Sequence, residues 1–299
     1  MKKYESDNIR NVGIFSHGGE GKTSIVEAML FLSGENNRLG RVDDGTSLMD
    51  YESEEVERKI TISSSLACFE WGKNKFNFID TPGDDNFIFD AKLCMRVLDA
   101  AVIVVSAVSG VKVGTEKVWQ YANEFSIPVC IFINKLDRER ADFERTVEDV
   151  QKNFTDTNPL VIQFPMGKEE SLRGVVDLLS MKAYVYKDDG SGGFDRIDIP
   201  SEFQAEANKY REKLVEIAVE MDDEVMERYL NGDEIKEEEI EKCLKDGIWT
   251  RRIAPIMCGS AAKNIGINTL LDNIVRCFPP PTYKNEVEGL DPKTGNTLK

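Results

Sequence analysis

Residues 16–23, Ser-His-Gly-Gly-Glu-Gly-Lys-Thr, have the residue types and spacing of a loop that surrounds phosphate groups. Glycines let backbone N–H groups turn inward around phosphate oxygens, and a helix that begins near Lys22 directs its positive end toward them. Lys22 would bring an ammonium to the terminal phosphates of a nucleotide, and the Thr23 hydroxyl would bind Mg²⁺. A glycine-rich turn that binds nothing is the alternative, but an apolar run before the loop and a helical pattern after it favour phosphate binding. The predicted phosphate-binding residues are His17, Gly18, Gly19, Glu20, Gly21, Lys22, Thr23 and Ser24.

His17 is the only histidine in the chain. It could act as a catalytic base, or it could serve the loop through its backbone while its side chain points away. No nucleophile is adjacent to it in the sequence, which favours the second interpretation.

The tetrapeptide Asn134-Lys135-Leu136-Asp137 follows an apolar run and can select the base. The Asp137 carboxylate can accept hydrogens from N1–H and the 2-amino group of guanine, whereas adenine would leave this carboxylate unpaired. Lys135 can cover a face of the base, and Asn134 can connect this loop to the phosphate loop. The backbone of Gly259-Ser260-Ala261 can reach the guanine O6. These residues favour a guanine nucleotide over the alternative of an ATP-dependent enzyme.

Two further segments have residues that can sense a γ-phosphate. Asp80-Thr81-Pro82-Gly83 follows another apolar run, where Asp80 can hold a water of the Mg²⁺ ion and the Gly83 amide can contact the γ-phosphate. Thr61 ends the polar stretch Arg58–Thr61 and can close onto both Mg²⁺ and the phosphate. An ordinary strand threonine is the alternative for Thr61. The predicted metal-binding residues are Thr23, Thr61 and, through water, Asp80.

Apolar runs alternate with amphipathic stretches, which predicts an α/β fold with a doubly wound, mostly parallel sheet. The runs are rich in Val, Ile and Phe without polar alternation, as in strands buried on both faces. They are Val12–Phe15, Phe76–Ile79, Ala101–Val105, Val129–Ile133 and Ile256–Cys258. The predicted helices are Ser24–Leu32, Asp90–Leu98 and Gly114–Phe125. A hairpin is expected from Ile62–Trp71 and Phe76–Asp80, joined by residues 72–75.

The α/β pattern is interrupted after about residue 158, which predicts an inserted α+β subdomain at 159–247. Two strands, Tyr184–Tyr186 and Phe194–Ile199, are expected there, followed by a helix whose start has Ser201 and Gln204 spaced as a capping box. The nucleotide-binding domain would then comprise residues 1–158 and 248–282. Residues 283–299 are too few to fold alone and are expected to begin a further domain.

Composition places the chain among ordinary globular proteins, with 41% hydrophobic and 31% charged residues. No apolar run reaches the roughly 20 residues of a membrane helix, and the N-terminus has no signal-peptide pattern. The six cysteines form no metal-type pair. The net charge of −16 argues against general, sequence-independent binding of nucleic acid.

These motifs, in this order and with an insertion between residues 137 and 259, resemble the elongation factor G family of translational GTPases. Residues 49–51 with 57–62 are similar to the family's first switch, 77–83 to its second, and 174–183 to its inserted subdomain. Residues 279–281 resemble the exit from the G domain, and 289–292 the start of the β-barrel domain that follows. Release-factor and tetracycline-protection GTPases are similar in the same motifs. The resemblance implies the N-terminal GTP-binding part of a multidomain, cytoplasmic, monomeric factor that acts on the ribosome in translocation or recycling.

Several positions depart from the family pattern, which suggests a divergent paralogue. Asp84 stands where the family has the His that positions the attacking water. Gly19 replaces an Asp that is expected to bind a monovalent cation, Lys59 replaces a Gly, and Asn86 replaces an Asp. The resemblance implies that hydrolysis of GTP to GDP and phosphate uses Lys22, Thr61, Gly83 and, at the position of that His, Asp84. The alternative is a GTP-dependent ribosome-binding switch with weak or no hydrolysis, because Asp84 is anionic.

The insertion also suggests a partner. Residues 201–246 contain 16 Asp or Glu and 7 Lys or Arg, a net charge of 7 − 16 = −9. In the family this region is expected to contact the stalk protein of the large ribosomal subunit, while the switches approach large-subunit rRNA without reading sequence. A solvated charged surface without a partner is the alternative.

Overall fold

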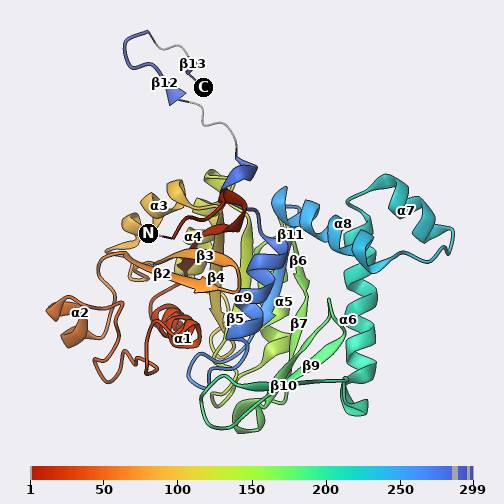
Figure 1. Cartoon of the computed structure of the whole chain (residues 1–299), viewed down its shortest axis with the longest axis horizontal. Coiled ribbons are helices and arrows are strands. Elements are labelled where there is room, and N and C mark those ends of the chain that lie inside the picture. Colours follow the sequence, from red (N-terminus) through yellow and green to blue (C-terminus); the bar gives the residue numbers. More distant parts are fainter. Residues whose placement is uncertain (1, 285–288, 295–296, 299) are drawn as a thin grey trace.

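The computed structural model of the chain describes residues 2–284, 289–294 and 297–298. Its largest element is a seven-stranded sheet with the strand order β2-β3-β1-β4-β5-β11-β6 (Figure 1). Every neighbouring pair is parallel except β2 with β3, so the predicted doubly wound, mostly parallel α/β fold is confirmed. The strands are β1 (Ile9–Phe15), β2 (Ser65–Trp71), β3 (Asn74–Asp80), β4 (Ala100–Ser106), β5 (Val129–Asn134), β6 (Asn158–Val161) and β11 (Ile253–Cys258).

The helices lie against this sheet because their apolar faces and those of the strands exclude water together. Helix α1 packs against α9, and α3 packs against α4. Strands β4 and β5 are buried along their whole length, as their uninterrupted apolar sequences predict. The helices of this part are α1 (Lys22–Ser33), α2 (Ser53–Arg58), α3 (Ile88–Cys94), α4 (Val113–Glu124), α5 (Phe143–Asn153) and α9 (Ile267–Cys277), with 3-10 turns η1 (Ser6–Asn8), η2 (Met95–Val97) and η4 (Pro281–Tyr283).

The strand order determines where a ligand can bind. Strand β1 lies between β3 and β4, so the chain crosses over β1 when it passes from β3 to β4. In open α/β sheets, ligands bind beyond the carboxyl ends of the strands at such a reversal. The carboxyl ends of β1, β3, β5 and β11 and the loops that follow them lie at that edge, and most of the predicted site residues are there; Thr61 comes from the segment between α2 and β2.

Local structure differs from the sequence prediction at three places. The hairpin of β2 and β3 has a two-residue turn, Gly72-Lys73, because Trp71 pairs with Asn74, and its first strand starts at Ser65 rather than Ile62. The predicted helix Asp90–Leu98 is α3 followed by the 3-10 turn η2. The predicted capping box is wrong: Pro200 is the N-cap, so Ser201 already lies in the first helical turn, without a side-chain cap.

A second sheet has the order β10-β9-β8-β7 and is antiparallel throughout. Its strands are β7 (Gln163–Met166), β8 (Gly174–Asp177), β9 (Lys182–Tyr186) and β10 (Phe194–Ile197), and the 3-10 turn η3 (Glu169–Ser171) precedes β8. Helices α6 (Ser201–Val219), α7 (Asp223–Leu230) and α8 (Glu237–Trp249) follow and project to one side (Figure 1). Residue 159, the predicted start of the insertion, falls inside β6, which belongs to the large sheet.

The remaining residues follow η4. A short pair, β12 (Gly289–Leu290) with β13 (Thr297–Leu298), lies in the segment predicted to begin another domain. Within that segment, residues 285–288, 295–296 and 299 lie outside the described residues, so the predicted boundaries of the domains stay predictions. None of the helices in the described ranges combines the length and apolar character needed to cross a membrane.

Core packing gives a stability prediction. Phe154 is 1% exposed and its ring stacks on Trp119 at a centroid distance of 4.1 Å. Phe154→Ala should lower the free energy of unfolding by about 3–5 kcal/mol, because it removes buried apolar area and leaves a cavity. Phe89→Ala is the control. Because Phe89 is 63% exposed, its substitution should lower the free energy of unfolding by less than about 0.5 kcal/mol. Urea unfolding measures both; equal effects would contradict the packing described.

Candidate nucleotide-binding site

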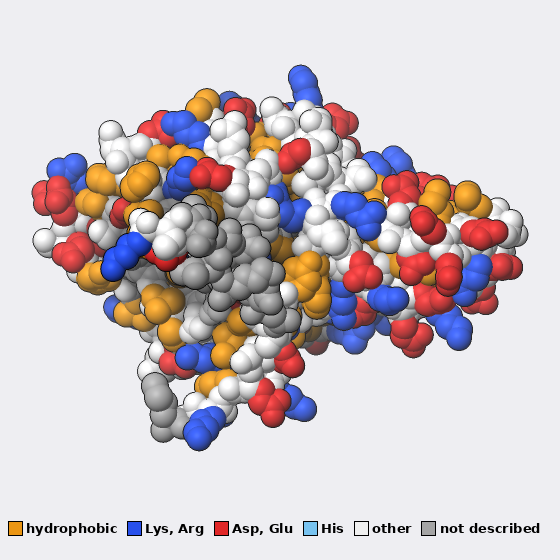
Figure 2. Space-filling model, turned by 90° about the horizontal axis from the view of Figure 1, so that it is seen from above, with side chains coloured by type: hydrophobic (Ala, Val, Ile, Leu, Met, Phe, Trp, Pro, Cys, Tyr) orange, Lys and Arg blue, Asp and Glu red, His pale blue; other side chains and the backbone are white. Residues whose placement is uncertain are grey.

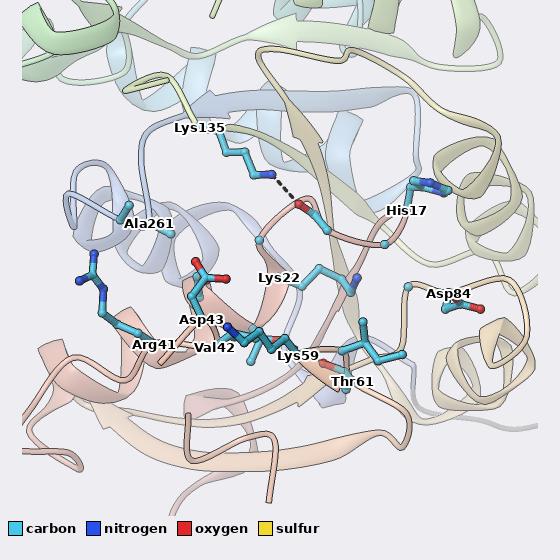
Figure 3. Close-up of a pocket in the computed structure, with 18 of the residues that line it drawn as sticks. His17, Lys22, Arg41, Val42, Asp43, Lys59, Thr61, Asp84, Lys135 and Ala261 are labelled. Carbon is cyan, nitrogen blue, oxygen red and sulfur yellow. Dashed lines mark hydrogen bonds between the residues drawn. The ribbon is translucent and has the colours of Figure 1, made fainter. Parts of the chain in front are cut away.

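A cavity of about 690 Å³ lies at the carboxyl edge of the large sheet (Figure 3). Its wall includes the predicted phosphate loop, where Gly19 and Gly21 have φ angles of 77° and 93° that favour glycine. A Cβ at Gly21 would also lie 2.6 Å from Asn134 Nδ2. The lining comes from residues 17–19 and 21–24, 39–43, 59–61, 83–86, 135, 138 and 261–262.

Lys22 is the buried cation of this cavity. Its Nζ lies 3.2 Å from Ser16 Oγ, and burial lowers the pKa of the ammonium while the nearby Asp80 charge opposes that shift. Gly83 packs directly against this lysine, so that a Cβ there would collide with Lys22 Nζ and would lie 2.9 Å from the Gly18 nitrogen. The phosphate loop and the segment after β3 therefore meet at the Lys22 ammonium.

Four oxygen-bearing side chains meet beside Lys22 at the predicted Mg²⁺ site. Thr23 Oγ1 lies 3.0 Å from Thr61 Oγ1, and the Thr61 hydroxyl donates to Asp50 Oδ1 at 2.8 Å. Both carboxylate oxygens of Asp80, and Oδ2 of Asp50, are buried without a hydrogen-bond partner in the described part of the chain. Burial raises the pKa of Asp80 to about 7.

The residues present fit a magnesium ion. Two hydroxyls and buried carboxylate oxygens without partners are hard oxygen ligands, which Mg²⁺ prefers together with waters and phosphate oxygens. Among the described residues, no group of three or more His, Cys, Asp or Glu side chains is arranged to hold a metal alone. Thr23 and Thr61 would thus bind the ion directly, Asp80 through water, and the substrate would supply the other oxygens.

At the other end of the cavity, two of the residues predicted to bind guanine, Lys135 and Ala261, belong to the lining. Asn134 Nδ2 donates to the Glu20 carbonyl at 3.0 Å, while its Oδ1 accepts from the Ala261 N–H at 3.1 Å. Lys135 and Ala261 line the cavity, and Lys135 Nζ donates to the Gly19 carbonyl. The structure therefore brings the loops after β1, β5 and β11 together.

The predicted base-reading carboxylate lies at the border of this end. Asp137 Oδ1 accepts from Ser260 Oγ at 2.5 Å, and the same hydroxyl accepts from the Lys263 N–H at 3.1 Å. Asp137, Ser260 and Gly259 are not among the residues that line the cavity. Ser260 fixes the carboxylate through one oxygen, which leaves further lone pairs for a base.

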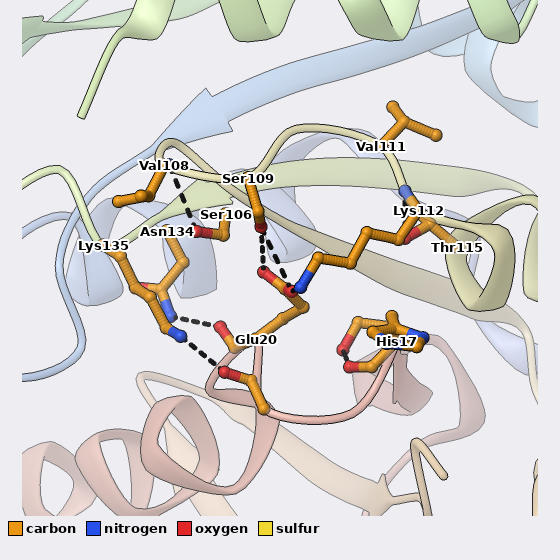
Figure 4. A network of polar contacts seen from close by, with 12 residues as sticks. His17, Glu20, Ser106, Val108, Ser109, Val111, Lys112, Thr115, Asn134 and Lys135 are labelled. Atoms are coloured by element: carbon orange, nitrogen blue, oxygen red, sulfur yellow. Dashed lines mark hydrogen bonds and ion pairs between the residues drawn. The ribbon is translucent and has the colours of Figure 1, made fainter. Parts of the chain in front are cut away.

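Glu20 is the one predicted phosphate-loop residue that does not line the cavity. It is 2% exposed and its Oε1 pairs with Lys112 Nζ at 2.7 Å, while Ser109 Oγ donates to the same carboxylate (Figure 4). The His17 side chain lies against the start of α4, where a Cβ at Gly114 would be 2.6 Å from His17 Nδ1. Both side chains contact the segment from Ser109 to Gly114, so their backbones and not their side chains are the candidates for phosphate contact.

Asp84 lies at the rim of the cavity, after Gly83. Its Oδ1 accepts from the Asn86 N–H at 2.9 Å and from Asn86 Nδ2 at 2.7 Å. Figure 3 shows the side chain directed away from Lys22 and Thr61. In this conformation the carboxylate stabilises a local turn and does not point into the cavity.

Sequence reasoning missed the buried carboxylates that hold the segment before Thr61. Glu27 accepts from Ser47 Oγ at 2.8 Å and from the Met49 N–H at 3.0 Å, and Glu55 accepts from the Ile62 N–H at 2.9 Å. Nothing in the local sequence marks Glu27, which lies in a helix about 20 positions earlier. Asp50 had a signal, because it belongs to the Met49–Tyr51 part of the family resemblance.

The pKa of Asp80 gives a prediction about pH. The nucleotide-free fold keeps a proton on Asp80 up to about pH 7, whereas the ordinary pKa is 3.8. Between these values the folded state binds more protons, so its stability falls as pH rises, by up to about 1.4 kcal/mol per pH unit. Mg²⁺ with a nucleotide displaces this proton, so the stabilisation it gives should increase from about pH 6 to pH 8.

Thermal unfolding with and without the Mg²⁺–nucleotide complex measures this effect. Asp80→Asn should remove the pH dependence of the stabilisation, and Asp188→Asn, at an exposed loop position, should keep it. A stabilisation by Mg²⁺–nucleotide that does not change with pH in the unaltered protein would contradict the prediction.

Comparisons with known proteins agree with this geometry. The family model for the elongation factor Tu GTP binding domain matches residues 7–280. A crystal structure of a protein from Thermus thermophilus is similar, with a TM-score of 0.87 and 30% sequence identity over 94% of this chain. The match covers 42% of that protein's chain, so this chain spans less than half the length of the relative. Because the family match extends over both sides of the inserted sheet and includes every loop of the cavity, the chain belongs to the translational GTPase family defined by the elongation factor Tu GTP binding domain.

Proposed function

We propose that this chain is the GTP-binding module of an elongation factor G-like GTPase that acts on the ribosome in the cytoplasm. The observation that carries the proposal is the convergence of the phosphate loop, Thr61 and Lys135 at one cavity, with the buried Asp80 carboxylate beside Lys22 and Asn134 hydrogen-bonded to the phosphate loop. The four-stranded sheet between β6 and β11 supports the narrower resemblance, because an insertion there was expected of an elongation factor G-like chain. Translocation and ribosome recycling both fit this module.

The chemistry is hydrolysis of GTP to GDP and phosphate. A water oxygen forms a bond to the γ-phosphorus, the bond to the β,γ-bridging oxygen breaks, and GDP leaves with that electron pair while the water's proton passes to phosphate. Mg²⁺, when bound, neutralises charge on the β- and γ-phosphate oxygens. Lys22 and the inward-turned amides of the loop, with the Gly83 amide, stabilise the charge that develops at these oxygens.

The projecting helices offer a surface for a basic partner. Asp and Glu side chains are grouped over the end of the molecule that α6, α7 and α8 form, with fewer Lys and Arg among them (Figure 2). Exposed charges steer encounters and set partner preference more than they add affinity. We assign this surface to the stalk protein of the large ribosomal subunit, and the cavity rim near the switches to large-subunit rRNA.

A second candidate function is a GTP-dependent switch that binds the ribosome but hydrolyses slowly. The observation in its favour is the Asp84 side chain, which accepts two hydrogen bonds from Asn86 and points away from the cavity. In this conformation the residue at the family's His position does not direct its carboxylate toward Lys22 and Thr61. GTP binding would then hold Thr61 and its segment closed until release rather than until hydrolysis.

If Asp137 selects the base, one substitution there should lower the affinity for a guanine nucleotide and raise the affinity for a xanthine nucleotide. Asp137→Asn replaces an acceptor by an amide N–H, which cannot pair with the 2-amino group of guanine. GDP affinity should fall about 100-fold or more, because buried polar groups are left unpaired. Xanthosine diphosphate, which has a carbonyl at that position, should gain affinity in the same variant.

Calorimetric titration in the presence of Mg²⁺ measures both affinities. Glu139→Gln is the matched control, because Glu139 is exposed near Asp137 and should leave both affinities unchanged. Loss of GDP binding without any gain for the xanthine nucleotide would mean that Asp137 supports the loop and does not read the base.

Hydrolysis and the role of Asp84 are tested together with the full-length parent protein. Ribosomes should stimulate its release of phosphate from GTP, and Asp84→His should raise that rate by about tenfold or more if the carboxylate limits water activation. A rate in the variant that is unchanged or lower would count against the slow-switch function. No stimulation by ribosomes in the unaltered protein and in the variant would contradict the proposed action on the ribosome.

A further inference from the structure

One cationic side chain of the cavity has no partner in the described structure. The lining contains the cations Lys22, Arg41, Lys59, Lys135 and Arg138. Four of them are engaged: Lys22 with Ser16 Oγ, Arg41 with Asp44, Lys135 with the Gly19 carbonyl, and Arg138 with Asp137. The Lys59 side chain alone makes no hydrogen bond or ion pair with any described residue, so its ammonium is available to a ligand.

The backbone presents Lys59 at a fixed place. It terminates α2 with φ 56° and ψ 38°, a left-handed conformation that is costly for a residue with a side chain. Its amide donates to the Glu55 carbonyl, and the Glu55 carboxylate accepts from the Ile62 N–H at 2.9 Å. Thr61, two residues later, is held by Thr23 and Asp50. The segment is therefore tied on both sides of Lys59.

The negative charge of the expected substrate, GTP, would be neutralised in part by an ammonium such as that of Lys59. GTP has one more phosphate than GDP, and its γ-phosphate must lie near Thr61 and Gly83 if these residues sense it. Among the described lining residues, Lys22 is the one buried ammonium, and its charge faces Asp80. The residue after Gly83 is the anionic Asp84. A second ammonium from the Thr61 side would balance the γ-phosphate charge.

We propose that Lys59 binds the γ-phosphate of GTP as a second ammonium opposite Lys22, which makes it a sensor of the triphosphate state. This inference rests on the proposed GTP-binding function and adds a residue to that site. The contact depends on the position of the segment between α2 and Thr61, so GTP would hold this segment closed through two groups, the Thr61 hydroxyl and the Lys59 ammonium. GDP lacks the phosphate that Lys59 would contact.

A competing arrangement is visible in the same cavity. Figure 3 shows the Lys59 side chain extending from the Thr61 side toward Asp43. No ion pair joins these two residues in the described structure, and the competing arrangement is that one forms when a nucleotide binds. Lys59 would then close the cavity mouth over any nucleotide and would not distinguish GTP from GDP.

The test compares affinities for GDP and for a β,γ-imido analogue of GTP, each with Mg²⁺. Lys59→Met removes the charge, Lys59→Gly removes it and relieves the left-handed backbone, and Lys59→Arg keeps it. Arg58→Met is the matched control, because Arg58 is exposed, pairs with Glu54 at 2.6 Å and does not line the cavity. Asp43→Asn tests the competing arrangement.

Lys59→Met and Lys59→Gly should lower the affinity for the GTP analogue about tenfold and leave the affinity for GDP within about twofold of the unaltered protein. The reason is that the charge-assisted contact is made only with the triphosphate. Lys59→Arg, Arg58→Met and Asp43→Asn should retain analogue binding. The inference would be overturned if the Lys59 variants bound both nucleotides equally more weakly, or bound both as tightly as the unaltered protein. It would also be overturned if Arg58→Met or Asp43→Asn lost the same affinity for the analogue.

Different results would contradict the role of Lys59 and the proposed function. If GDP binds normally and the Lys59 variants do not change the preference for the analogue, the role of Lys59 is wrong and the proposed function stands. If the unaltered protein binds neither guanine nucleotide, the proposed function is wrong and the inference fails with it. Lys59→Gly should unfold at a temperature no lower than the unaltered protein, which separates lost binding from lost folding.

Discussion

A single buried amide joins the three loops that form the nucleotide cavity. Asn134 is 2% exposed at the end of β5, where it donates to the Glu20 carbonyl of the phosphate loop and accepts from the Ala261 N–H of the loop after β11. Only a side chain with both a donor and an acceptor in one plane can make this bridge. The distance between the phosphate end and the base end of the cavity depends on it, so the rest of the site follows from this contact.

In the described structure, the ligand-free site contains charged groups without partners, which Mg²⁺ and a nucleotide would supply. The chain has a net charge of −16, yet five cationic side chains line this one cavity. Beside them lie buried oxygens of Asp80 and Asp50 that have no partner among the described residues. Unpaired buried carboxylates are costly, so Mg²⁺ with its phosphates would relieve a cost that the ligand-free fold carries. Binding of the ion and nucleotide would for this reason be coupled to the position of the segment at Thr61.

The features that could be predicted from the sequence are those with a local cause. Apolar runs such as Val129–Ile133 identified the central strands, and the motifs directly after them were predicted to bind the nucleotide; the structure places these motifs at one edge of the sheet. Contacts between residues far apart in the sequence were not predicted. They include the Glu20–Lys112 ion pair and the hydrogen bond from the Met49 N–H to the Glu27 carboxylate. The hairpin turn was predicted as residues 72–75 but spans two residues, because the pairing of Trp71 with Asn74 sets its length.

We expect this cavity to select a guanine nucleotide in the presence of magnesium. The most direct measurement is a calorimetric titration of the unaltered chain with GDP and with ADP, each with Mg²⁺, followed by competition between them. The account predicts one GDP per chain, with ADP unable to displace it at comparable concentration. A preference for ADP, or no heat of binding with either nucleotide, would contradict it.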